Sequence, residues 1–298
     1  MVKYNPRDWF LLIFKFHKAD TFRTLFPLII SIGVYSGLIA WLEMEVWKLS
    51  DTSHLKNLSL IHSALGMVIS MLLVFRTNTA YERWWEGRKI WGSLVNSSRN
   101  LAIKIRAIVP SQGPYFVAMI PNYAFAMKNH LRGEHHSKEL EDAEGFNPEL
   151  LQAKDHVPNQ IAGIIVQRIE SLRKEGKLLP EHVLFFQTEL NNFTDAVGAC
   201  ERIRKTPIPF SYSVFLKKFI FLYVMTLPFG FVFSLGYWVI PVVSIIFYVL
   251  ASLELIAEEI EDPFGKDAND LPTEEIALTI RLSCRQILQS DSDTSVQK

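Results

Sequence analysis

The sequence predicts an all-α integral membrane protein with four transmembrane helices and a helical cytoplasmic domain. The stretches 24–42, 57–75 and 219–253 each contain no Asp, Glu, Lys or Arg. A bilayer core about 30 Å thick needs roughly 20 residues of helix, so each of the first two stretches fits one crossing. No stretch alternates apolar and polar residues over the length of a strand, which favours helices throughout.

The third stretch, 219–253, is too long for one crossing and too short for two full crossings with a loop. Helix-breaking residues lie near its middle: Pro228, Gly230, Gly236 and Pro241. Because such residues interrupt helices, the stretch predicts a tight hairpin of two helices. The alternative for all three stretches is a set of buried core helices in a soluble protein, although uncharged runs of about 18 or more residues are the usual sign of membrane helices.

Composition excludes several classes of protein. The chain carries 31 Lys and Arg residues against 31 Asp and Glu residues, so it lacks the basic surplus of a nucleic-acid binder and no nucleic-acid partner is expected. The two cysteines, Cys200 and Cys284, form no CxxC pair, which argues against a disulfide scaffold or a cysteine-rich zinc site. Only His62 lies inside an uncharged stretch, and no Ser-His-Asp or Cys-His set has catalytic spacing, so no enzyme is expected.

Positive charges predict the orientation of the chain, because cytoplasmic flanks of membrane helices are enriched in Lys and Arg. They gather before the first stretch, after the second and before the third, whereas the loop between the first two contains only Lys48 and Lys56. Both termini and region 76–218 are therefore expected in the cytoplasm. The predicted divisions are a cytoplasmic N-terminal arm (1–23), transmembrane helices 1 and 2 (24–75), a cytoplasmic helical domain (76–218), transmembrane helices 3 and 4 (219–253) and a cytoplasmic C-terminal segment (254–298).

The cytoplasmic region has helical patterns of its own. No proline interrupts the chain from Arg76 to about Val109, so the second membrane helix is expected to continue into the cytoplasm as one long helix. The chain is expected to break between Pro110 and Pro121. Shorter helices are then predicted at 122–131, near 159–174 and at 181–204, with a polar, loop-like stretch at 132–157.

The C-terminal segment is predicted to hold an acidic turn and an amphipathic helix. Pro263-Phe-Gly265 ends the acidic continuation of the last membrane helix. Asp270 can cap the helix that follows. The apolar face of that helix consists of Ile276, Ile280, Cys284 and Ile287.

Two motifs are distinctive. The run FRTNTAYERWWEGRKIW at 75–91 lies where the second membrane helix enters the cytoplasm, and IEDPFGKDAND at 260–270 follows the last membrane helix. Together with the four membrane segments and the break at Pro207-Ile-Pro209, they resemble the bestrophin family of ion channels over roughly residues 5–288. The resemblance is greatest to the bacterial branch, which lacks the long C-terminal tail of animal members, and it implies a multi-pass protein of the bacterial inner (plasma) membrane.

The resemblance implies a homopentamer around one central pore, with the second membrane helix of each subunit as its lining. The narrow neck of this pore matches Met67, Met71 and Phe75. At about 100° per residue, the i, i+4, i+8 spacing places these residues on one helical face. Five copies would make three stacked apolar rings, which can gate by dewetting. The two methionines are more flexible than the isoleucine and phenylalanines of animal members. Without the resemblance, the alternative is a helix–helix packing stripe.

Below the neck, the same helical face becomes polar. Its residues are Asn78, Glu82, Trp85, Glu86 and Lys89. This change suits a water-filled vestibule, although an ordinary solvated helix face is the alternative for each residue. Ile208 matches the cytoplasmic aperture of the family, and the alternative for this position is an ordinary loop isoleucine.

In animal relatives, the acidic segment after Pro-Phe-Gly binds calcium and couples to opening. Asp267 and Asp270 match its side-chain ligands, and Asp262 replaces an Asn that offers its backbone carbonyl. Closely spaced oxygen ligands suit a hard cation. Lys266 and Ala268 interrupt the acids, so the resemblance implies a degenerate calcium site, with a helix cap and a solvated acidic turn as the alternative. Bacterial relatives generally need no calcium, and no cofactor is expected to be required.

A second metal site is conceivable where His130, His135 and His136 accompany Glu134. Neighbouring histidines point to different faces of any regular element, and no i, i+4 pair exists among these three. The sequence therefore argues against a metal site here.

The resemblance predicts an ion channel whose partners are the lipid bilayer, permeant monovalent ions and copies of itself. Chloride or another monovalent anion is the first expectation. Since Glu82 and Glu86 accompany Lys89 on the vestibule face, and some bacterial relatives conduct cations, a sodium channel of the same fold is the alternative. The alternative from another class is a membrane-anchored interaction protein, which would be a monomer or dimer in detergent.

Overall fold

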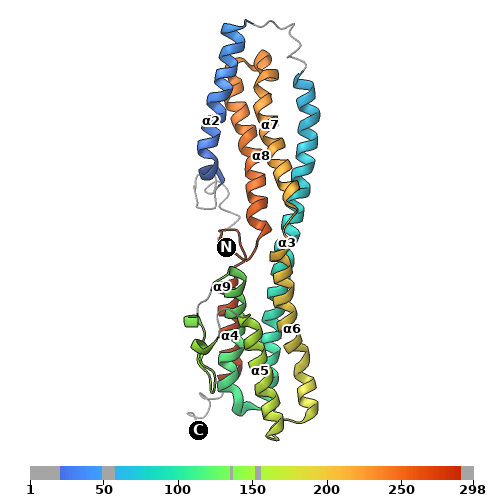
Figure 1. Cartoon of the computed structure of the whole chain (residues 1–298), viewed down its shortest axis with the longest axis vertical. Coiled ribbons are helices and arrows are strands. Elements are labelled where there is room, and N and C mark those ends of the chain that lie inside the picture. Colours follow the sequence, from blue (N-terminus) through green and yellow to red (C-terminus); the bar gives the residue numbers. More distant parts are fainter. Residues whose placement is uncertain (1–20, 49–57, 135–136, 152–155, 290–298) are drawn as a thin grey trace. The chain divides into compact units, whose positions relative to one another are not determined.

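The computed structural model describes residues 21–48, 58–134, 137–151 and 156–289. Most of the N-terminal arm, the pair His135 and His136, and the tail after Gln289 lie outside the described residues. Within the described part, the chain is helical apart from turns and one isolated antiparallel bridge between Ala143 and Phe146 (Figure 1). The all-helical class is confirmed.

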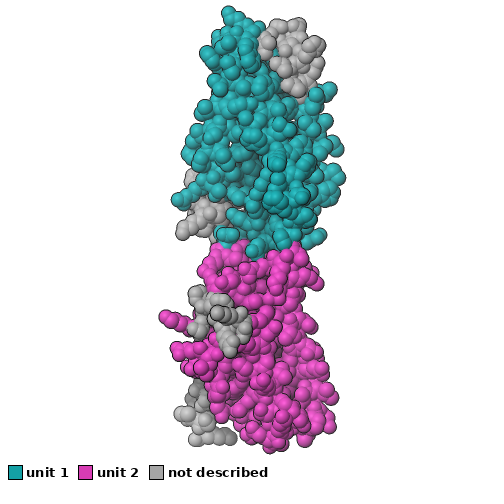
Figure 2. Space-filling model, in the orientation of Figure 1, with its two compact units in different colours: residues 1–84, 207–262, 267–269 teal, residues 85–206, 263–266, 270–298 magenta. Residues whose placement is uncertain are grey.

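The chain divides into two compact units (Figure 2). Unit 1 consists of residues 1–84, 207–262 and 267–269, and unit 2 of residues 85–206, 263–266 and 270–298. The helices of unit 1 are α2 (Thr21–Trp41), the first part of α3 (Leu58–Ile108), α7 (Phe210–Leu235) and α8 (Val239–Glu261). Among the described residues, three helical stretches are long and apolar enough to cross a membrane: Thr21–Val46, Ser59–Ile108 and Phe210–Glu261.

The stretch Phe210–Glu261 is a hairpin of two helices. Helix α7 ends at Leu235, a 3₁₀ turn spans Gly236–Trp238, and α8 packs back against α7 (Figure 1). Gly236 has φ 54° and ψ −137°, a conformation open almost only to glycine. The hairpin predicted for this stretch is confirmed, and its turn lies at one of the four predicted breakers.

An apolar core holds the helices of unit 1 together. Helix α2 packs against both α8 and α7. Helix α3 contributes the buried Ile69 and Leu73, which join the core residues Val224 and Leu227 of α7 and Val243 of α8. One side of α3 therefore faces the rest of unit 1.

Helix α3 is continuous from Leu58 to Ile108 and contains 51 residues. The prediction that the second membrane helix extends without a break to about Val109 is confirmed. Neither proline nor positive-φ glycine occurs in it, so nothing in its backbone chemistry ends it earlier.

Unit 2 is built around a buried helix. Helix α4 (Gly113–Arg132) is packed by α5 (Val157–Lys174), α6 (Pro180–Lys205) and α9 (Thr273–Gln289). The predicted break after Pro110 is confirmed, since α3 ends at Ile108 and a 3₁₀ turn spans Pro110–Gln112. The predicted helix start at residue 122 is wrong, because α4 begins at Gly113 and includes Pro121. Proline removes one helical N–H donor, but almost every residue of α4 is buried, and this burial outweighs the lost hydrogen bond.

The remaining helices of unit 2 agree with the predicted ones to within a few residues. These are α5 and α6, which enclose the predicted stretches 159–174 and 181–204. On α9, the predicted apolar residues Ile276, Ile280 and Cys284 are buried, while Ile287 is half-buried.

Candidate functional site

Helix α3 has two contrasting faces within unit 1. His62, Ile69, Leu73 and Ala80 are buried on one side. Met67, Met71 and Phe75 lie on the opposite side, with 78%, 59% and 53% of their surface exposed. These three predicted neck residues therefore share a face that no other described helix of the unit covers.

Two contacts with α7 set the rotation of α3 about its axis. His62 Nε2 lies 2.9 Å from Thr226 Oγ1. A Cβ at Gly66 would lie 2.8 Å from the Tyr223 hydroxyl oxygen, so a larger residue there would require the Tyr223 side chain to move. Because these contacts lie on the buried side, they direct the Met67–Met71 face away from the core of the unit.

The predicted vestibule residues differ in their surroundings. In unit 1, Asn78 and Glu82 are exposed. In unit 2, Lys89 is exposed, whereas Glu86 is half-buried and its Oε1 lies 2.6 Å from Arg202 Nη2. One of the two acidic charges on this face is thus paired with a cation.

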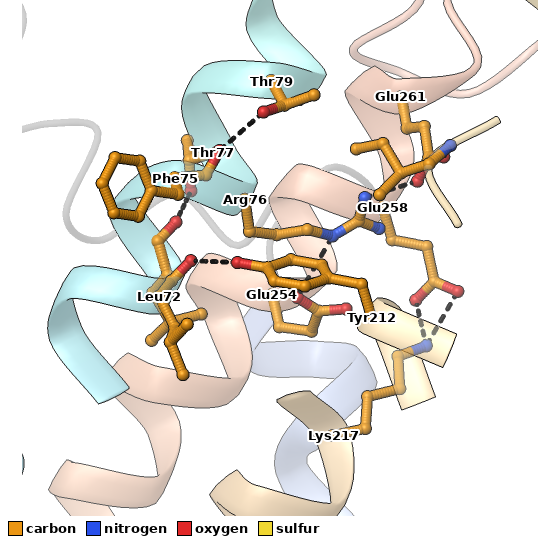
Figure 3. Close-up of polar contacts among 12 residues, drawn as sticks. Leu72, Phe75, Arg76, Thr77, Thr79, Tyr212, Lys217, Glu254, Glu258 and Glu261 are labelled. Carbon is orange, nitrogen blue, oxygen red and sulfur yellow. Dashed lines mark hydrogen bonds and ion pairs between the residues drawn. The ribbon is translucent and has the colours of Figure 1, made fainter. Parts of the chain in front are cut away.

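A buried arginine follows the neck residues directly. Arg76 has a side chain that is only 1% exposed, and its Nη1 lies 2.7 Å from Glu261 Oε2. Its Nε lies 3.5 Å from Glu254 Oε2, and both carboxylates belong to α8 (Figure 3). Beside this ion pair, the Tyr212 hydroxyl donates a hydrogen bond of 2.9 Å to the Leu72 carbonyl on α3 (Figure 3).

Glu261 connects the neck helix to the predicted aperture. Its Oε1 accepts a 2.6 Å hydrogen bond from the backbone N–H of Ile208, while Oε2 pairs with Arg76. Its backbone carbonyl accepts a 3.0 Å bond from Arg83 Nε. One residue at the end of α8 therefore holds both the half-buried Ile208 and the residue next to Phe75. We did not expect this connection from the sequence.

The three acids matched to a calcium site lie in different surroundings. Asp262 and Asp267 are exposed. Asp270 is only 2% exposed, and its Oδ2 would lie 2.7 Å from a Cβ placed on Gly265. The backbone carbonyl of Asn269 accepts a 3.0 Å hydrogen bond from the Trp84 indole. Lys266 and Ala268 interrupt the acids, and the degenerate calcium site stays a prediction.

A different set of metal-ligating side chains meets in unit 2. His130, His156 and Glu201 place one ligand atom each within 4.8 Å of the others. Burial raises the pKa of Glu201, but its hydrogen bonds to His130 and Lys205 outweigh that effect and leave the pKa below its usual value. The sequence grouped His130 with its near neighbours and missed both of these partners.

Comparisons with known proteins agree with the fold and the motifs. The family model of the bacterial and fungal bestrophin protein matches residues 1–286. A voltage-dependent anion channel-forming protein from Nostoc sp. is 40% identical over 224 residues, which cover 72% of this chain and 73% of the relative. A relative of the same description from Synechocystis sp. is 36% identical, over 75% of this chain and 76% of its own length.

A crystal structure of a mutant bacterial bestrophin homologue from Klebsiella pneumoniae has a TM-score of 0.76 to this chain. The two sequences are 28% identical, and the match covers 87% of this chain and 97% of that one. With the family model matching nearly the whole length, the chain belongs to the bestrophin family, in its bacterial and fungal branch.

Proposed function

We propose that the chain forms a homopentameric channel that conducts chloride or other monovalent anions across the bacterial inner membrane. Each subunit contributes four transmembrane helices, α2, the first part of α3, α7 and α8, with both termini in the cytoplasm. The proposal rests chiefly on the face of α3 that carries Met67, Met71 and Phe75, which is apolar and uncovered in the single subunit. Four helices of one chain cannot enclose a pore, so oligomerisation is part of the proposal.

The exposed face of α3 changes its chemistry along the helix. The uncovered face is apolar at Met67 and Met71 and becomes polar at Asn78 and Glu82. A face that passes from apolar to polar suits a water-filled path with an apolar constriction.

In this proposal, the neck residues form the gate. Apolar rings exclude water when they are narrow, and ions pass only when the rings widen enough to wet. Methionine side chains have three rotatable bonds, so two of the three rings can change width by rotamer changes. Ile208 forms a second constriction, which Glu261 links to the neck helix through Arg76.

The preference for anions rests on the descriptions of the relatives and on the charges along the predicted vestibule. The curated relatives are described as anion channel-forming proteins. In this chain, the ion pair with Arg202 offsets the charge of Glu86. The vestibule face is therefore less acidic, and less favourable to cations, than the sequence indicates. The exposed Glu82 still favours cations, so a sodium channel of the same fold is the second candidate.

Reversal potentials in planar bilayers with asymmetric NaCl are expected to lie near the chloride equilibrium potential. Replacing Glu82 with Gln should raise the chloride-to-sodium permeability ratio about twofold or more, because a ring of five negative charges is removed from the conduction path. Glu181→Gln, at an exposed acid on the first turn of α6, is the control and should leave the ratio unchanged.

Three results would contradict this assignment. Reversal near the sodium equilibrium potential would identify the cation channel instead. If Glu82→Gln and Glu181→Gln change the permeability ratio equally, Glu82 does not line the ion path. A monomer or dimer in detergent that produces no flux would favour a membrane-anchored interaction protein.

A further inference from the structure

Two histidines and a glutamate converge in unit 2 from three separate segments. His130 lies in the last turn of α4, His156 caps the start of α5, and Glu201 lies near the end of α6. His130 Nε2 is 2.5 Å from Glu201 Oε1, and His156 Nε2 is 3.1 Å from the same oxygen. The two imidazole centroids are 4.2 Å apart. Two ring nitrogens thus face a single carboxylate oxygen.

From this arrangement we propose that His130, His156 and Glu201 bind a divalent transition-metal ion, with Zn²⁺ as the best match. Two imidazoles and one carboxylate are a ligand set that zinc accepts in proteins, with a fourth position left for water. Tetrahedral bonds of about 2.0–2.1 Å place neighbouring ligand atoms about 3.3 Å apart. Each histidine nitrogen therefore needs to move away from Glu201 Oε1 by only a fraction of an ångström to about one ångström to admit the ion.

The surroundings leave room for this adjustment. The side chains of His130, His156 and Glu201 are 26%, 29% and 20% exposed, so each of them reaches solvent. His156 and Glu201 also line a cavity of about 660 Å³ between α5 and α6. Water can reach the fourth coordination position from this cavity.

Metal binding has one local cost. The backbone N–H of Asn159 donates to His156 Nδ1 over 3.2 Å. When Nε2 binds a metal, the ring proton moves to Nδ1, and this helix-capping hydrogen bond is lost. The N–H lies in the first turn of α5 and is exposed, so water can replace the lost acceptor.

The position of the three ligands indicates a structural role for the metal. His130 and His156 lie at the two ends of the long connection between α4 and α5. Glu201 lies on α6 and contacts both histidines. An ion held by all three would close this connection and fix its ends, which reduces the conformational entropy of the open chain. We therefore expect a clamp that stabilises unit 2.

Purified full-length protein, carrying a histidine-free tag and stripped with EDTA, should be titrated with Co²⁺ as a spectroscopic substitute for Zn²⁺. The expected result is one Co²⁺ per subunit, with the intense visible absorption of four-coordinate cobalt, displaced by Zn²⁺. Zn²⁺ should also raise the thermal unfolding temperature of the protein, since it binds the folded state. His130→Ala and Glu201→Gln should each weaken binding by about 100-fold or more and abolish the thermal shift.

Lys205→Met is the matched control. Lys205 Nζ lies 3.3 Å from Glu201 Oε2, so this change removes a competing cation but none of the ligands. Metal affinity should stay the same or rise about two- to fivefold, the usual strength of an exposed ion pair. If the three side chains form a hydrogen-bonded cluster only, the unmodified protein will take up no stoichiometric metal.

Two other outcomes would also overturn the proposal. One is metal uptake that survives both His130→Ala and Glu201→Gln in protein whose oligomer is intact. The other is a loss of uptake in Lys205→Met as large as in the ligand variants. If Glu201→Gln fails to fold, His156→Ala replaces it, because His156 lies on a different segment. Ion flux enters none of these measurements, so the metal site and the channel function can fail independently.

Discussion

Replacing Met71 with alanine is expected to increase ion flux through the assembled protein about tenfold or more. Met71 is 59% exposed on the uncovered face of α3, between Met67 and Phe75. Truncating it in five subunits widens the middle ring and lets water enter the neck more easily. A tenfold change needs the barrier to fall by only about 1.4 kcal/mol.

The measurement is halide efflux from liposomes that contain matched amounts of intact oligomer. Val34→Ala is the control, because Val34 is 69% exposed on α2, another of the membrane helices, and lies outside the proposed pore. Flux through this control should equal that of the unmodified protein. If both variants raise flux equally, the effect comes from general loosening and not from the neck. If Met71→Ala leaves flux unchanged, Met71 does not limit conduction.

The second large effect is expected at Arg76. Changing it to methionine keeps most of the side-chain length but leaves Glu254 and Glu261 without their buried cation. Removing one partner of a buried ion pair typically costs about 3–5 kcal/mol. Arg76→Met should therefore lower the thermal unfolding temperature strongly and release the backbone of Ile208, which Glu261 holds.

An exposed ion pair in the same unit provides the comparison. Lys217 Nζ lies 2.8 Å from Glu258 Oε2, with both side chains about half exposed (Figure 3). Lys217→Met removes the same charge from the same unit, but exposed pairs contribute only about 0–1 kcal/mol. Thermal unfolding followed by intrinsic fluorescence should separate the two variants clearly. If both variants lower the unfolding temperature equally, the buried ion pairs of Arg76 contribute no more to stability than the exposed pair of Lys217.

The long-range outline of the fold could be predicted because membrane helices have a strong local signature. Uncharged length marks α2, α3 and the α7–α8 hairpin, and Gly236 supplies the backbone conformation that the turn requires. The start of α4 could not be predicted in the same way. Pro121 normally signals a break, and only tertiary burial of the whole helix explains why it is tolerated.

The candidate site was predicted in part, for a related reason. The spacing of Met67, Met71 and Phe75 is a property of one helix, so sequence alone could group them. The Arg76–Glu261 cluster joins residues far apart in the chain. A signal existed, because Arg76 and Glu254 each border an uncharged stretch, and such charges at the ends of adjacent membrane helices often pair.

The metal-ligand cluster shows the same limit more sharply. His130 and His156 are separated by a polar connection, and Glu201 lies on a third segment. Spacing rules find ligands on one helix or hairpin. Applied to His130 with His135 and His136, they argued against a metal site. Only the packing of α4, α5 and α6 brings these three residues together.

The most direct test of the account is an electron cryomicroscopy map of the full-length protein in lipid nanodiscs. We expect five copies around one axis, with Met67, Met71 and Phe75 of every subunit turned toward that axis and Ile208 lining a second narrow point. A map in which these three side chains face lipid, or in which the subunits enclose no common axis, would contradict it.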